Sequence, residues 1–188
     1  LYNALTSTTP ALDAKAEAAA NEEIVSDLRN AAVAPLAAAV TEASKANGSV
    51  MKIQAEDIQL GLPSVTKEEA IRAAGALLAK RGYVDDSYAD AMVEREKLVS
   101  TYMGMGVAIP HGTSEKKSTV KKSGVVMLQY PDGVDFGDEK AYLIFGIAGV
   151  GDAHLDLLAH VCEVLEDEEA LEMMKKTPDI KFVLTHLQ

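Results

Sequence analysis

The sequence predicts an α/β fold in which helices flank a small β-sheet, and three observations support this prediction. Short apolar runs at residues 107–109, 124–130 and 142–148 have the length and composition of buried strands. Around them, apolar residues recur at the three- and four-residue spacing of amphipathic helices. The two kinds of segment alternate from about residue 51 to the end of the chain, so we expect helices packed on a small sheet.

The N-terminal part of the chain differs in character from the rest. Alanine-rich stretches with helix-forming composition lie between residues 11 and 46, and Pro35 interrupts them. The Asn-Gly-Ser sequence at residues 47–49 is a typical helix breaker. We therefore predict an alanine-rich helical linker or extension over residues 1–49, followed by one domain over residues 50–188.

Two helices are predicted early in this domain. Residues Thr66 to Glu69 form a capping box, in which Thr66 is the N-cap and the Glu69 side chain reaches back to it. This helix ends at Gly82. A second helix should run from about Asp86 to Lys97. The expected core positions of the first helix are Ala70, Ile71, Ala74, Leu77 and Leu78.

The second half of the domain is predicted to contain a turn and three helices. The Pro-Asp-Gly sequence at residues 131–133 indicates a turn after the second strand. Asp152 is expected to cap the first of the helices, and the next begins at Asp167. The last helix should start at Thr177-Pro178, with proline as its first helical residue. The expected buried stripe of the Asp152 helix consists of Leu155, Leu158, Ala159, Cys162 and Leu165.

Composition and charge narrow the function classes. The net charge of −11 argues against nucleic acid and anionic membranes as partners. No run of about 18 apolar residues is present, so we expect no direct membrane insertion. The single cysteine, Cys162, excludes an internal disulfide framework and fits a reducing, cytoplasmic compartment. Because the chain begins with Leu1 and no signal-peptide pattern follows, we expect a processed product or a piece of a longer polypeptide.

The sequence Gly-Val-Ala-Ile-Pro-His-Gly at residues 106–112 is the most informative in the chain. The apolar strand stops at Pro110, which has no N–H for sheet pairing, and Gly112 removes side-chain bulk and permits unusual backbone angles. His111 is thereby presented at a strand end with nearby backbone open to a ligand. A neutral imidazole, with an unperturbed pKa of about 6.5, is a good nucleophile near pH 7. A structural histidine at a strand end is the alternative interpretation.

An ordered set of short motifs surrounds this histidine. They are EREK at 94–97, STY at 100–102, GVAIPHGT at 106–113, QYPDGV at 129–134, FG at 136–137, FGIA at 145–148 and AHL at 153–155. In this order they resemble the mannitol-type IIA domain of the bacterial phosphoenolpyruvate-dependent sugar phosphotransferase system, the type-2 EIIA family. The resemblance extends from about Ala55 to the C-terminus.

The resemblance implies a mixed sheet and a role as phosphocarrier. His111 would accept a phosphoryl group from the phosphocarrier protein HPr and pass it to a cysteine of the cognate IIB domain. A sugar alcohol, mannitol for the nearest branch, would be phosphorylated downstream. No cofactor or metal is implied, because the donor phosphoryl group is already activated. Such domains often lie at the C-terminal end of a longer transporter with IIB and IIC parts, which would tether this chain to the inner face of the membrane.

The resemblance also implies supporting roles for four residues. His154, in the first turn of a helix, would assist transfer at a helix N-terminus that favours anions. The Arg95 guanidinium would offer a planar fork of donors to phosphoryl oxygens. The Thr113 hydroxyl and Gly112 would help to bind the phosphoryl group. The alternatives are a local hydrogen bond for His154 and backbone capping for Thr113. For Arg95 the alternative is a surface position, paired with Glu94 or Glu96 or with the turn before it.

Two other functions stay open, and one residue departs from the family pattern. The chain is alternatively a regulatory IIA-like phosphodomain of the fructose or nitrogen-related branch, or a scaffold without transfer activity. Many relatives carry a polar residue where this chain has Met105, and a polar group there could orient the histidine. His160 is expected to be solvated and His186 to be structural. Histidine, cysteine and carboxylate residues are not spaced as a zinc site.

Overall fold

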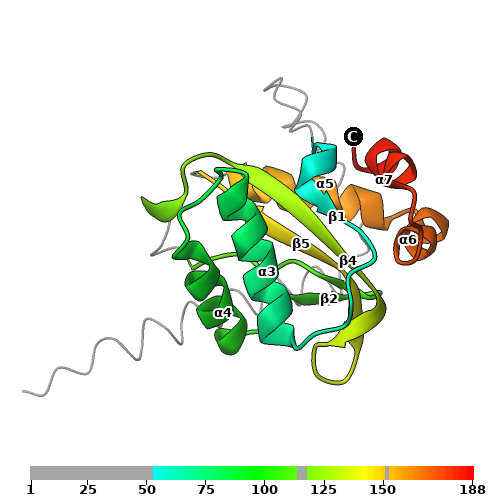
Figure 1. Cartoon of the computed structure of the whole chain (residues 1–188), viewed down its shortest axis with the longest axis horizontal. Helices are drawn as coiled ribbons and strands as arrows, with labels where there is room; N and C mark the ends of the chain where they lie inside the picture. The colour runs from blue at the N-terminus through cyan, green and yellow to red at the C-terminus, as the bar shows by residue number, and fades with distance from the viewer. Residues whose placement is uncertain (1–52, 114–117, 151–152) are drawn as a thin grey trace, which may run out of the picture.

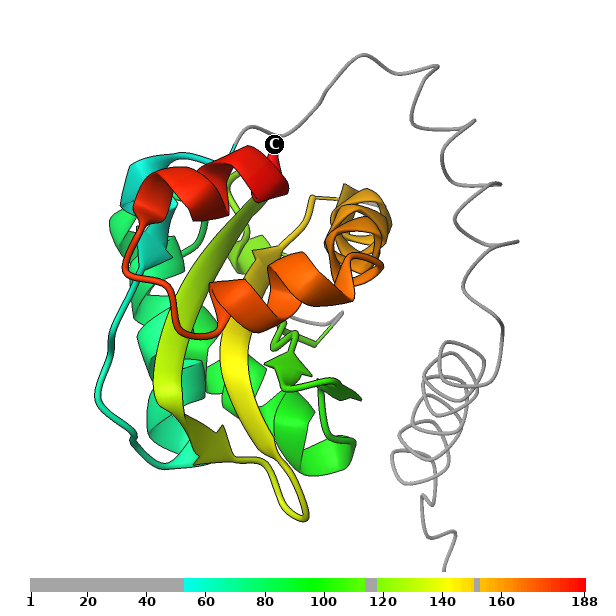
Figure 2. The same cartoon turned by 90° about the vertical axis from the view of Figure 1, so that its right-hand side faces the viewer.

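The computed structural model describes residues 53–113, 118–150 and 153–188, and for residues 153–156 it describes the helical backbone only. The helical extension predicted for residues 1–49 and the cap at Asp152 lie outside the described residues. In the described part, a five-stranded sheet lies between two layers of helices (Figure 1, Figure 2). This arrangement confirms the predicted α/β class.

The sheet mixes parallel and antiparallel pairs in the order β1-β4-β5-β3-β2. Strands β4 and β5 form an antiparallel pair at its centre, and β2 pairs antiparallel with β3. Strand β1 lies parallel to β4, and β3 lies parallel to β5, so the carboxyl ends of β3 and β5 meet at one edge. The strands are β1 (Ile58–Gln59), β2 (Tyr102–Gly104), β3 (Val107–Ala108), β4 (Gly124–Asp135) and β5 (Lys140–Ala148).

Helices cover both faces of the sheet. Helices α3 and α4 pack on one face, and α5, α6 and α7 pack on the other (Figure 2). They are the 3₁₀ helix η1 (Ala55–Asp57) and the α-helices α3 (Lys67–Lys80), α4 (Tyr88–Leu98), α5 (Ala153–Leu165), α6 (Glu168–Met174) and α7 (Ile180–Leu187). Among these described helices, none is both long enough and apolar enough to cross a bilayer.

The central strands supply both cores by alternation of their side chains. In β5, Ile144 packs toward α3 and α4, whereas its neighbours Leu143 and Phe145 pack toward α5–α7. This is the two-residue period of a strand that is covered on both faces. Burying each of these side chains contributes about 1.5–3 kcal/mol. The position of β5, including its carboxyl end, is therefore fixed from two sides.

Helix α3 begins and ends as its sequence predicts. The Thr66 side chain accepts a hydrogen bond from the Glu69 N–H, and the Glu69 carboxylate accepts one from the Thr66 N–H at 2.9 Å. At the other end, the N–H of Gly82 donates to the Ala79 carbonyl and that of Tyr83 to the Leu78 carbonyl. This pair of bonds is a Schellman motif. All five predicted core positions of this helix are buried.

The turn predicted at residues 131–133 is wrong. Strand β4 continues to Asp135, and its residues 130–133 form a bulge opposite Tyr142. A bulge leaves residues out of the hydrogen-bond ladder, so Pro131 with its missing N–H is tolerated there. The chain reverses later, at residues 136–139, where the Phe136 N–H donates to the Glu139 carbonyl at 2.9 Å.

The stripe predicted for helix α5 is rotated from the observed one. The face buried against the sheet consists of Leu157, Val161, Val164 and Leu165. Leu158, Ala159 and Cys162 are only half-buried, and for Leu155 the backbone alone is described. Apolar residues occur almost all round this helix, so the sequence contained two possible stripes. Burial, with Glu166 and Glu163 nearby, raises the pKa of the Cys162 thiol.

The predicted start of helix α6 is confirmed, and the predicted start of helix α7 is wrong. Asp167 caps α6, and its carboxylate accepts a hydrogen bond from the Ala170 N–H at 3.0 Å. Helix α7 starts later than predicted, because Asp179 is its N-cap and accepts from the Lys181 N–H at 2.9 Å. Pro178 therefore precedes the cap and is not the first helical residue.

Candidate functional site

His111 lies where β3 ends beside the carboxyl end of β5. It forms an isolated parallel bridge with Ile147, whose N–H donates to the Pro110 carbonyl at 3.1 Å. The side chain of His111 is half-buried. The strand-end position that the sequence predicts for this imidazole is therefore confirmed.

A backbone hydrogen bond fixes the tautomer of the His111 ring. Its Nδ1 lies 2.8 Å from the carbonyl oxygen of Ile109. A carbonyl oxygen can only accept, so Nδ1 carries the hydrogen and the lone pair of the neutral ring is on Nε2. The ring therefore presents Nε2 as its nucleophilic atom.

Gly112 is required by the close approach of a tyrosine ring. A Cβ atom at this position would lie 2.5 Å from Cε2 of Tyr88, which starts helix α4. The Gly112 N–H donates to the Tyr88 hydroxyl at 2.8 Å, and that hydroxyl donates to the Ile147 carbonyl at 2.8 Å. Gly112 does not have a positive φ, so lack of bulk, and not an unusual backbone angle, explains this glycine.

Tyr88 is a residue that sequence reasoning missed. Its two partners lie 24 and 59 residues away along the chain, so no local pattern could identify it. The side chain is buried, at 4% exposure. Burial raises the pKa of its hydroxyl, and the hydrogen bond from Gly112 opposes that shift.

Arg95 is buried in α4, at 7% exposure, so the alternative of a surface ion pair is wrong. Its Nη1 donates to the Val99 carbonyl at 2.9 Å, just after the helix ends. Two residues on, the Thr101 carbonyl accepts a hydrogen bond from the Ile109 N–H at 3.0 Å. The loop that Arg95 contacts is thus bonded to the segment that leads into His111.

The topology brings His154 to the same edge of the sheet as His111. It lies in the first turn of α5, directly after the carboxyl end of β5. The Ser123 hydroxyl accepts a hydrogen bond from the Val150 N–H at 2.9 Å and so holds the start of the connection between β5 and α5. No sequence signal identifies Ser123, because its partner is 27 residues away.

The roles of the remaining predicted residues stay predictions. Thr113 is half-buried and precedes residues 114–117, which lie outside the described residues. Among the side chains described, no group of three or more histidine, cysteine, aspartate or glutamate residues is arranged to hold a metal ion.

Met105 lies at the other end of β3, in the hairpin turn that joins it to β2. Met105 and Gly106 have φ of +53° and +77°, the pattern of a type I′ turn. The Met105 side chain is 50% exposed. The backbone at position 105 therefore requires a residue that tolerates the left-handed region of φ and ψ, and asparagine tolerates it better than methionine does.

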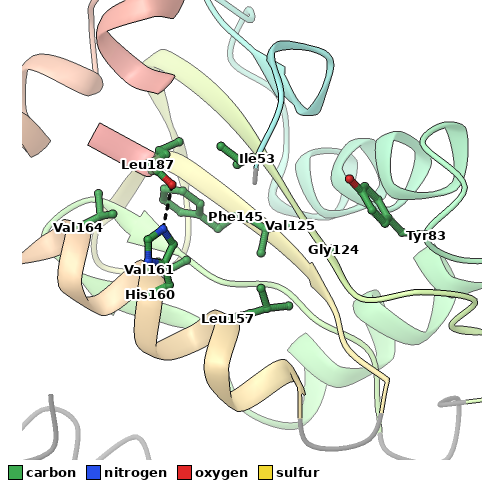
Figure 3. A pocket seen from close by; sticks show the side chains of 10 residues that line it. All are labelled: Ile53, Tyr83, Gly124, Val125, Phe145, Leu157, His160, Val161, Val164 and Leu187. Carbon is green, nitrogen blue, oxygen red and sulfur yellow. Dashed lines mark hydrogen bonds between the residues drawn. The ribbon is translucent and has the colours of Figure 1, made fainter. Parts of the chain in front are cut away.

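An apolar pocket lies between the sheet, α5 and α7, away from the predicted site (Figure 3). Neither His111 nor Arg95 lines it. His160 does, and its Nε2 donates to the Leu187 carbonyl at 2.8 Å. Its side chain is still 38% exposed, with Nδ1 3.6 Å from Glu163 Oε2, so His160 is partly solvated, as expected, and also bonded to α7. His186 has the structural role expected, with Nδ1 donating to the Phe182 carbonyl at 2.8 Å.

A family model described as "Phosphoenolpyruvate-dependent sugar phosphotransferase system, EIIA 2" matches residues 51–188. The chain belongs to this family. Its EIIA domain is 46% identical over 136 residues to the mannitol-specific phosphotransferase enzyme IIA component of Geobacillus stearothermophilus, covering 72% of this chain and 94% of that protein.

Solved structures of this EIIA family share the fold. The crystal structure of IIA mannitol from Escherichia coli is similar with a TM-score of 0.70 and 45% identity, covering 73% of this chain and all of that one (100%). The complex of enzyme IIAMTL and phosphorylated enzyme IIBMTL from the same organism contains a chain similar with a TM-score of 0.71 and 45% identity, covering 73% of this chain and 98% of that one.

Longer relatives contain the EIIA domain as one part. The mannitol-specific EIICBA component of Pasteurella multocida is 42% identical over 172 residues, which cover 89% of this chain. The chain spans 28% of the length of that relative.

Proposed function

We propose that this chain is a phosphocarrier that accepts a phosphoryl group from HPr on His111 and passes it to a cysteine of a IIB domain. The observation that carries the proposal is the hydrogen bond from His111 Nδ1 to the Ile109 carbonyl. It leaves Nε2 as the nucleophile at the end of β3, in a chain of the EIIA family.

The proposed transfer is a balanced exchange between nucleophiles. The Nε2 lone pair of His111 forms a bond to phosphorus while the N–P bond of phosphorylated HPr breaks and its imidazole leaves with the electron pair. The Ile109 carbonyl stabilises the Nδ1–H of the phosphorylated ring, which carries more positive charge. In the second transfer a IIB thiolate attacks the same phosphorus, and His111 leaves as neutral imidazole.

The other predicted residues have proposed roles that follow their positions. His154, in the first turn of α5, would bind phosphoryl oxygens at a helix N-terminus. Arg95 and Thr113 would add hydrogen-bond donors to the phosphoryl oxygens. Gly112, which has no side chain, leaves room for the Tyr88 ring. Because charge is spread over three phosphoryl oxygens during transfer, donors placed there favour the transition state.

The substrate of the complete system is also a proposal. The similarity to relatives named for mannitol supports mannitol as the sugar alcohol phosphorylated downstream. The relatives named EIICBA support a longer polypeptide in which IIB and IIC parts tether this domain to the membrane.

The test is to map phosphorylation after incubation with the complete upstream relay that ends in phosphorylated HPr. We expect mass spectrometry to find an acid-labile phosphoryl group on His111 of the wild type. The His111→Ala variant should acquire no such label. His154→Ala should accept phosphate more slowly but still at His111. His186→Ala is the matched control, because His186 bonds within α7, and it should be labelled like the wild type.

Each outcome decides between functions. Undiminished acid-labile label on a folded His111→Ala variant contradicts the proposal. Complete loss of acceptance in a folded His154→Ala variant contradicts the supporting role of His154. Label on His111 that no IIB domain removes favours the regulatory phosphodomain, whereas transfer to a IIB cysteine supports the phosphocarrier.

A further inference from the structure

The hydroxyl of Tyr88 links the backbone that follows β3 to the backbone of β5. In a parallel ladder Ile147, the residue opposite His111, would make two bonds to the neighbours of His111. Its N–H would donate to the Pro110 carbonyl, and its carbonyl would accept directly from the Gly112 N–H. The first bond is present, from the Ile147 N–H to the Pro110 carbonyl at 3.1 Å. In place of the second, the Gly112 N–H donates to Tyr88 Oη and Tyr88 Oη donates to the Ile147 carbonyl, each at 2.8 Å.

This insertion ends the sheet at the histidine without leaving a buried polar group unpaired. A direct bond would hold Gly112 against β5 as a continued strand. The Tyr88 hydroxyl gives both the Gly112 N–H and the Ile147 carbonyl a hydrogen-bond partner. The peptides before and after His111 are therefore each tied to Ile147, one directly and the other through Tyr88.

We propose that Tyr88 is a positioning residue for phosphoryl transfer, whose hydroxyl holds the peptide after His111 so that Nε2 faces the incoming phosphorus. The inference rests on the proposed function of His111. The ring would then be held from both sides, by the Ile109 carbonyl on Nδ1 and by the Tyr88 bridge behind Gly112. Preorganised geometry of this kind contributes to rate because small misplacements of a nucleophile are costly.

A second tyrosine provides a matched control within the same chain. The Tyr83 ring also packs over a glycine, Gly124, and its hydroxyl also makes a hydrogen bond, to Asp57 Oδ1 at 3.1 Å. Removing this hydroxyl deletes a tyrosine hydrogen bond of similar kind without touching either peptide of His111. A purely structural role for Tyr88 predicts similar behaviour of Tyr83→Phe and Tyr88→Phe.

The experiment compares wild type, Tyr88→Phe and Tyr83→Phe at matched folded fraction. At saturating phosphorylated HPr, we expect the rate of His111 labelling to fall about tenfold in Tyr88→Phe and to stay at the wild-type level in Tyr83→Phe. The concentration of HPr for half-maximal rate should not change, because Tyr88 is buried. The imidazole nitrogen resonances of His111 should shift in Tyr88→Phe only. Equal rates and unshifted His111 resonances in the two variants would overturn the proposal.

Amide exchange on the wild-type protein keeps the proposal testable even if Tyr88→Phe does not fold. The Gly112 N–H should exchange at least about 100-fold more slowly than an unprotected loop amide, because its acceptor is buried. Exchange at the unprotected rate would overturn the inference. If the wild type accepts no phosphate on His111, the proposed function fails, while the exchange and the His111 resonances still report on the Tyr88 bridge.

Discussion

The two ends of the short strand β3 make different use of the same residue type. At its start, Gly106 follows Met105 in a hairpin turn and has a φ of +77°. At its end, Gly112 follows His111 and lies against the Tyr88 ring without a positive φ. Both glycines leave room for a tyrosine ring, since a Cβ would lie 2.8 Å from Tyr142 Cδ2 at Gly106 and 2.5 Å from Tyr88 Cε2 at Gly112. Only Gly106 is needed for its backbone angle as well.

The comparison separates a structural end of the strand from a functional one. The Met105 side chain is exposed, although Gly106 beside it is buried, and the strain of a left-handed methionine there is local. The histidine end is held by buried groups from three elements: β5 through Ile147, α4 through Tyr88, and the segment before the histidine through Ile109. Changes at the first end should therefore alter stability alone, and changes at the second should alter transfer as well.

Of the substitutions that compare the two ends of β3 and leave His111 in place, Gly112→Ala should have the largest effect. The new Cβ would lie 2.5 Å from Tyr88 Cε2, in a buried site where the ring cannot move freely. We expect a loss of about 1–3 kcal/mol in the free energy of unfolding, from overpacking. Phosphoryl acceptance at His111 should fall more than about tenfold, because the Tyr88 bridge is displaced. Urea unfolding and single-turnover labelling measure the two effects.

Gly106→Ala is the control at the other end of β3. It should also destabilise, by about 1–2 kcal/mol, because alanine disfavours a positive φ and its Cβ would lie 2.8 Å from Tyr142 Cδ2. Its labelling rate per folded molecule should equal that of the wild type. If both glycine variants slow transfer equally, the separation of the two ends is wrong.

The same two ends differ in how far the sequence could predict them. The strand end at His111 and the capping box of α3 follow from residues within a few positions of one another, so local rules were enough. Tyr88 could not be found in this way, because only tertiary packing brings α4 to Gly112 and Ile147. Arg95 was identified through the family resemblance, but its burial could not be, because an arginine between two glutamates has the pattern of a solvated helix face.

The errors have equally specific physical causes. Pro131 and Gly133 have the composition of a turn, and only the resumed pairing of Val134 with Ala141 shows that they form a bulge. In α5, Val161 is buried in place of Cys162 because of where β5 lies relative to the helix. The spacing of apolar residues along the helix does not predict that position. Helix α7 begins after Asp179 and not at Thr177, because the carboxylate of Asp179 accepts a hydrogen bond from one of the first N–H groups of the helix.

Ser123→Ala should have a smaller effect and tests whether the histidine end includes His154. The hydroxyl of Ser123 holds the Val150 N–H near the start of the connection to α5. Its loss should slow labelling of His111 about threefold, since the first turn of α5 would be less well positioned. In a His154→Ala background the same substitution should have no further effect, because interacting sites are non-additive. An undiminished threefold effect in that background would show that Ser123 acts independently of His154.

Met105→Asn should have the smallest effect and the opposite sign. Asparagine adopts a φ near +53° more readily than methionine, and the side chain is exposed at this position. We expect the free energy of unfolding to rise by about 0.5–1 kcal/mol, with no change in the labelling rate of His111. A faster transfer at unchanged stability would show instead that a polar residue at this position orients the histidine. Unfolding by urea, measured beside single-turnover labelling, therefore decides whether the hairpin end of β3 takes any part in the chemistry of the other end.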